Sequence, residues 1–102
     1  MIKTRNKIFA EIGGGSDKDN TFVLRQWKGW KGLLFNSGRY FMGGQSQQIL
    51  INVMVTPSEV LKIFRDYKVA KDLDYLSVDI DGNDYWVTKE ILKEYKPAVV
   101  SV

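Results

Sequence analysis

A glycine run close to the amino terminus is the first place where the sequence could do chemistry. Gly13–Gly15 follows the apolar segment 8–12, and Glu11 stands two residues before the first glycine. Glycines between a strand and a helix let backbone approach a nucleotide-like ligand, because no Cβ stands in the way. Lys18 breaks the dinucleotide fingerprint, and the P-loop pattern is absent too. A ligand-binding loop and a plain turn both fit this pattern.

An acidic segment in the second half of the chain is the other candidate site. Asp79 and Asp81 close the apolar stretch 73–80, and in a continuing strand they would share one face. Two carboxylates at the carboxyl end of a buried strand could accept a proton, bind hydroxyls or hold a cation. The simpler interpretation is a turn followed by a helix cap, with Asp84 as the expected cap.

This acidic segment also matches part of a calcium-binding loop. The residues at loop positions 1, 3, 5 and 12 are Asp79, Asp81, Asn83 and Glu90. Position 6 should be glycine but is Asp84, and the preceding residues indicate a strand where the calcium hand needs a helix. The sequence therefore argues against a calcium hand at this place, while cation binding by Asp79 and Asp81 stays open.

Aromatic and basic residues alternate in the segment 27–31. Trp27 and Trp30 could stack nucleic-acid bases while the neighbouring lysines contact phosphates. Tryptophans that fill the core, with lysines facing water, explain the same pattern. The basic cluster is short and the net charge is only +3, so we favour the core interpretation and expect no nucleic-acid partner.

Composition excludes several classes of protein. The 102 residues allow one domain, expected to span 1–102. The chain has no cysteine and no histidine, so disulfides, thiolate nucleophiles, imidazole metal ligands and Ser-His-Asp triads are absent. No apolar run approaches the roughly 20 residues of a membrane span, and no secretory signal is apparent. We therefore expect a cytoplasmic protein.

The elements that must position these residues alternate between strands and helices. Strands are predicted at 8–12, 32–36, 49–55, 73–80 and 98–102. Helices are predicted at 21–27, in a second segment that begins at 57, and in a third segment that ends at 95. Thr56 is the expected cap of the second helix, and Glu59 would complete its capping box. The alternation predicts an α/β fold with about five mostly parallel strands and flanking helices.

Taken together, these segments resemble one family of enzymes. The segments 9–15, 29–35, 55–60 and 73–87 look like motifs of S-adenosylmethionine-dependent methyltransferases of the FkbM-like group. The stretch 73–87 is the most specific of them, and the resemblance runs from about residue 8 onward. It implies a reduced Rossmann-like fold that holds only the nucleotide-binding half of the family's domain.

The resemblance also implies functional residues and a cofactor. Glu11, Gly13 and Gly15 would hold the methionine part of S-adenosylmethionine. Asn36 stands where the family usually has an acidic residue that binds the ribose hydroxyls, so one carboxylate is replaced by an amide. Asp79 and Asp81 would serve as a base or bind a cation. The methyl acceptor would be a small molecule or a glycan.

Two other classes of function stay open. A non-catalytic remnant or assembly subunit would keep the fold and expose an unfinished sheet edge, which predicts self-association or a partner chain there. The replaced acidic residue and the short chain both favour that class. A small nucleic-acid-binding module around Trp27 and Trp30 would show binding that depends steeply on salt.

Overall fold

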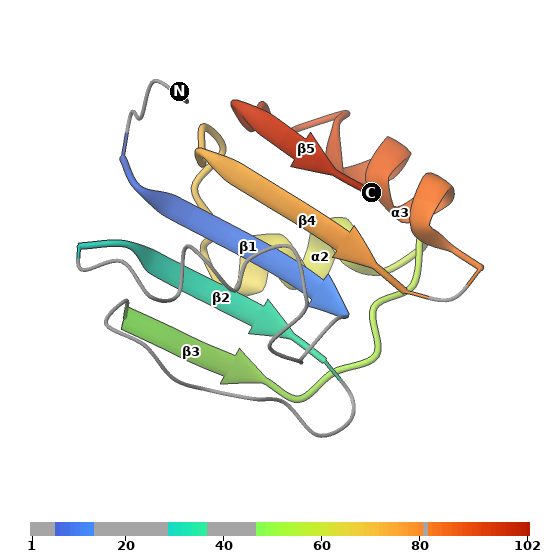
Figure 1. Cartoon of the computed structure of the whole chain (residues 1–102). Coiled ribbons are helices and arrows are strands. Elements are labelled where there is room, and N and C mark those ends of the chain that lie inside the picture. Colours follow the sequence, from blue (N-terminus) through green and yellow to red (C-terminus); the bar gives the residue numbers. More distant parts are fainter. Residues whose placement is uncertain (1–5, 14–28, 37–46, 81) are drawn as a thin grey trace.

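Within the part of the chain that the structure describes, five parallel strands form one sheet (Figure 1). The computed structural model describes residues 6–13, 29–36, 47–80 and 82–102. Its strands lie in the order β3-β2-β1-β4-β5, and two described helices accompany them. The elements are β1 (Ile8–Gly13), β2 (Lys31–Phe35), β3 (Gln47–Ile51), α2 (Val60–Asp66), β4 (Tyr75–Asp79), α3 (Asp84–Ile91) and β5 (Val99–Ser101). The predicted α/β, Rossmann-like fold is confirmed, whereas the predicted helix 21–27 lies outside the described residues.

The two faces of the sheet carry separate apolar clusters. Successive strand residues point to opposite faces, so Ala10 and Ile12 face one side of β1 and Phe9 faces the other. The larger cluster joins Ala10 and Ile12 to the buried sides of α2 and α3, which places both helices on that face. The smaller cluster packs Phe9 against Trp30 and Leu34 on the opposite face. Parallel strands buried on both faces explain why the segment that predicted β4 shows no clean polar alternation.

Aromatic rings hold α2 between the sheet and the chain after α3. The ring of Phe64 stacks on Phe35 with centroids 5.3 Å apart and meets Tyr95 edge-on at 5.2 Å. Burial raises the pKa of the Tyr95 hydroxyl. At the surface, Arg65 forms an ion pair with Glu94, and its hydrogen bond lowers the pKa of the Glu94 carboxyl. These contacts fix α2 relative to the end of α3.

The third strand lies earlier than the sequence predicts. The strand expected at 49–55 is β3 at Gln47–Ile51, and residues 52–55 are not part of the sheet. Among the described strands, β3 pairs with β2 alone, and the last pair joins Phe35 to Ile51. Because β2 ends at Phe35, residues 52–55 have no described strand beside them with which to form backbone hydrogen bonds. The segment 52–55 therefore leaves the sheet at its carboxyl edge.

Both described helices begin without the caps that the sequence predicts. The helix expected from 57 begins at Val60, because the chain first turns: the Thr56 carbonyl accepts bonds from the amides of Glu59 and Val60. The Thr56 hydroxyl bonds the Glu59 carboxylate at 3.3 Å, so the expected capping box is wrong. Asp84, the expected cap of α3, is instead its first helical residue.

The third helix also ends earlier than predicted. The sequence predicts a helix that continues to Tyr95, but α3 ends at Ile91. The next residues form tighter turns, in which the amides of Lys93 and Glu94 bond carbonyls three residues earlier. These turns bring Tyr95 into the core, where it is buried.

Candidate functional site

The order of the strands creates a change of direction at the middle of the sheet. From β1 the chain builds β2 and β3 on one side, and then β4 and β5 on the other. β1 and β4 lie side by side, with Gly13 opposite Asp79 at their carboxyl ends. In open parallel sheets, ligands bind outside the carboxyl ends of the strands at such a switch point. The topology therefore selects the ends of β1 and β4 as the place to look for a site.

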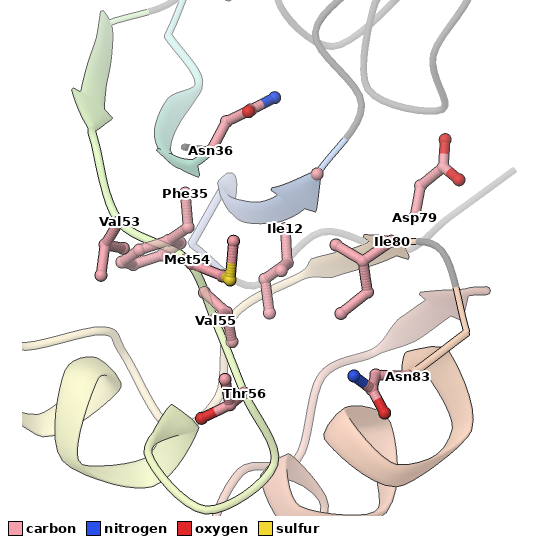
Figure 2. Close-up of a pocket in the computed structure, with 11 residues that line it drawn as sticks. Ile12, Phe35, Asn36, Val53, Met54, Val55, Thr56, Asp79, Ile80 and Asn83 are labelled. Carbon is pink, nitrogen blue, oxygen red and sulfur yellow. The ribbon is translucent and has the colours of Figure 1, made fainter. Parts of the chain in front are cut away.

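A cavity of about 420 Å³ lies at this switch point (Figure 2). That volume is in the range of roughly 300–1,000 Å³ that is typical of small-molecule sites. Its walls come from the ends of β1, β2 and β4, the segment after β3 and the turn before α3. The lining residues are Ile12, Gly13, Phe35, Asn36, Val53, Met54, Val55, Thr56, Asp79, Ile80 and Asn83.

Gly13 is required by the close approach of two strands. Its φ is +81°, a backbone conformation that side chains rarely adopt. A Cβ at this position would lie 1.8 Å from the backbone oxygen of Asp79. Packing against β4 therefore accounts for this glycine whether or not a ligand binds. It also leaves bare backbone at the cavity wall, where a ligand can approach closely.

Four polar side chains line the cavity: Asn36, Thr56, Asp79 and Asn83. Asn36 follows β2 and is half-buried, and its backbone amide donates a 3.1 Å bond to the Ile51 carbonyl. The exposed carboxylate of Asp79 ends β4, and the amide of Asn83 stands at the start of α3. Figure 2 shows these side chains around the apolar part of the wall. Apolar walls with a few polar groups suit a ligand that has a flat apolar part and hydroxyls.

The remaining predicted site residues fall into two groups. Glu11 is fully buried within β1, between Leu34 of β2 and Ser77 of β4 in the register, and it is not among the described residues that line the cavity. Gly15 and Asp81 lie outside the described residues. The structure thus brings Gly13, Asn36 and Asp79 together, and the expected pair of Asp79 with Asp81 stays a prediction.

Two alternative interpretations of the sequence concern a metal ion at this edge of the sheet and nucleic acid bound by Trp27 and Trp30. Among the described residues, no group of three or more acidic side chains could hold a metal ion. Asp81, which the calcium-loop pattern needs, lies outside these residues, so that pattern stays untested. Trp30 is buried, and its ring lies 6.5 Å from that of Phe9. It is therefore a core residue with no face free to stack on a base, while Trp27 lies outside the described residues.

The segment after β3 supplies the part of the site that sequence reasoning missed. Val53, Met54 and Val55 line the cavity, although the sequence analysis places them inside a strand. Asn52 interrupts their apolar run, and asparagine is depleted in strands. That single polar residue was the available signal that the strand ends near it.

None of the helices in the described ranges is long and apolar enough to cross a membrane. Comparison of the chain with protein-family models, with curated proteins and with solved structures gives no match.

Proposed function

We propose that this chain binds S-adenosylmethionine and works as a methyltransferase-like domain. The observation that carries the proposal is the cavity at the switch point of a parallel sheet, between Gly13 and Asp79. The motif resemblance of the sequence points to the same cofactor, and Gly13, Asn36 and Asp79 are the predicted residues that meet at this cavity.

The chemistry of the cavity wall matches the parts of this cofactor. The apolar side chains of Val53, Val55 and Ile80 offer a surface for the adenine ring. The amide of Asn36 can bond a ribose hydroxyl, as donor or acceptor. The carboxylate of Asp79 complements the positive charge of the sulfonium centre. Backbone at Gly13 leaves room for the methionine part.

The contribution of the chain to methyl transfer would be mainly positional. The cofactor would supply an activated methyl group: an acceptor atom bonds to the methyl carbon in an in-line displacement, the S–CH3 bond breaks, and S-adenosylhomocysteine leaves. Holding the two reactants in line accounts for much of the rate of such a step. Asp79 is the described carboxylate at the cavity and would take the proton when the acceptor is a hydroxyl of a small molecule or glycan.

A second candidate function is a cofactor-binding or assembly subunit without catalysis. Asn36 favours it, because an amide replaces the carboxylate that the resembled family uses for the ribose hydroxyls. A methylation assay separates the two candidates: binding of S-adenosylmethionine without turnover on a panel of hydroxylated acceptors supports the subunit.

Titration calorimetry of Asn36→Ala tests the proposed ribose contact. Loss of one hydrogen bond should weaken binding of S-adenosylmethionine about three- to tenfold. Asn52→Ala is the matched control, because Asn52 is exposed and does not line the cavity. Equal affinities of the two variants would contradict the contact.

Asp79→Asn tests the electrostatic part of the site. Removing the negative charge should weaken S-adenosylmethionine about two- to fivefold, since exposed ion pairs contribute little. S-adenosylhomocysteine has no sulfonium charge, so its affinity should change less. Asp66→Asn on α2 makes the same change in net charge away from the cavity. An equal loss for both ligands, or the same loss in Asp66→Asn, would rule out contact between Asp79 and the sulfonium.

A further inference from the structure

A second cavity lies between α3 and the end of the chain, away from the switch point. Its volume is about 540 Å³, and it is lined by Tyr85, Thr88, Lys89, Leu92, Lys93 and Val102. Three of these carry large exposed apolar surfaces: Tyr85 is 63% exposed, Leu92 48% and Val102 66%. Figure 1 shows α3 beside β5 and the carboxyl end of the chain. We call this cavity the α3 groove.

The α3 groove adjoins an open edge of the sheet. β5 is the last strand in the sheet order, so one side of it has no neighbouring strand among the described elements. The amide of Val99 donates to the Asp74 carbonyl at 3.0 Å, toward β4. Because these groups alternate along a strand, the N–H and C=O of Val100 point to the open side. β5 can therefore accept another strand.

The side chains of β5 extend the apolar face of the sheet against which α3 packs. Val100 is in register with Leu76, whose side chain belongs to the cluster on the helix face. Val100 and Val102 therefore face the helices, while Ser101 faces the other side. A strand added to β5 would place its own helix-facing side chains in the α3 groove. Such a strand needs apolar residues at alternating positions, as β5 itself has.

We propose that the α3 groove and the edge of β5 bind a second copy of this chain across a two-fold axis. The two β5 strands pair antiparallel, so the two sheets form one continuous sheet. Val100 of each copy supplies hydrogen bonds to the other, and Val102 of each copy contributes to filling the other's groove. An interface of this kind is self-complementary and closes at two copies, which leaves no open edge at β5.

The pattern of α3 is also self-complementary. A two-fold axis that pairs β5 with its copy sets the two α3 helices antiparallel. When Tyr85 meets Leu92 of the second copy, the same spacing sets Asp84 against Lys93 of the second copy. Apolar residues then meet apolar residues. The Asp84 carboxylate meets the Lys93 ammonium group, which also pairs with Glu90 of its own chain at 2.7 Å.

Sedimentation of the full chain tests the proposal first. We expect a dimer, with Tyr85→Lys and Leu92→Lys each raising its dissociation constant about tenfold or more, because each puts a charge in the apolar contact. Ile49→Lys is the matched control: Ile49 is 61% exposed on β3, at the opposite edge, and its variant should dimerise like the parent. Melting curves confirm that each variant is folded. A monomeric parent at 200 μM, or loss of the dimer only in Ile49→Lys, overturns the proposal.

Disulfide trapping then tests the pairing of the strands. The chain has no cysteine, so a single introduced thiol reports only on its own neighbours. Under mild oxidation Val100→Cys should form covalent dimers faster than Ile49→Cys does. Equal rates would show that β5 does not pair with its copy. Neither experiment depends on S-adenosylmethionine, so failure here leaves the proposed function standing, and the converse also holds.

Discussion

Gly13→Ala is expected to lower the free energy of unfolding by about 2–5 kcal/mol. About 1–3 kcal/mol of this comes from overpacking, because the new Cβ would lie 1.8 Å from the Asp79 backbone oxygen. A further 1–2 kcal/mol or so comes from holding a side chain at a φ of +81°. Either β1 and β4 separate at their carboxyl ends, or the loop after β1 changes conformation. Thermal or urea unfolding measures the loss.

Two other glycines provide controls for the backbone part of this effect. Gly29 and Gly82 have φ values of +93° and +87°, and a Cβ at either position would meet no atom of the described residues within 4 Å. Alanine there should cost only about 1–2 kcal/mol. A Gly13→Ala variant no less stable than Gly29→Ala and Gly82→Ala would contradict the close approach of β1 to β4. Ligand loss in a Gly13 variant is informative only when the variant is folded.

Asp74→Ala is expected to cost about 2–4 kcal/mol of stability, because a buried carboxylate that accepts two backbone bonds would be lost. Asp74 precedes β4 and is fully buried. Its Oδ2 accepts the amides of Asn6 at 3.1 Å and of Lys7 at 2.8 Å, where the chain enters β1. Lys7 has a φ of +57°, so this carboxylate holds an otherwise unfavourable backbone.

Unfolding of neighbouring variants checks this contribution of Asp74. Asp74→Asn keeps an acceptor oxygen and should cost less than Asp74→Ala. Asp72→Ala is the exposed control, since within the described ranges the Asp72 carboxylate accepts a bond from the Asn6 side chain alone. It should cost less than about 1 kcal/mol. If Asp72→Ala is as harmful as Asp74→Ala, the two backbone bonds do not hold the start of β1.

The layout of the sheet could be predicted from local pattern, and the ends of its elements could not. The apolar run at 73–80 indicated a strand buried on both faces, and β4 occupies its middle. β3 stops at Ile51 because its neighbour β2 stops at Phe35, which is a property of the partner strand. The start of α2 at Val60 depends on a turn stabilised by the Thr56 carbonyl. Tertiary partners decide such boundaries, and one strand's sequence does not contain them.

The sequence predicts the site residues at the ends of β1, β2 and β4, but it does not predict the residues after β3 that form the cavity wall. Gly13 and Asp79 were singled out by type and position and Asn36 by the family resemblance, and the topology brings all three to one cavity. Val53 and Met54 were missed because their β-rich pattern describes a strand equally well. The contact of Gly13 with the Asp79 backbone depends on the register between β1 and β4. No sequence motif specifies that register.

Localised binding of S-adenosylmethionine is the most direct test of the central claim. Amide chemical shifts of the isotope-labelled chain can be followed by NMR during titration with S-adenosylmethionine. The account predicts that the largest shifts fall at the switch point, on Gly13, Asn36, Met54 and Asp79, while residues at the amino ends of the strands, such as Lys31 and Tyr75, stay unchanged. No shifts at millimolar cofactor, or shifts centred on the amino ends of the strands, would contradict it.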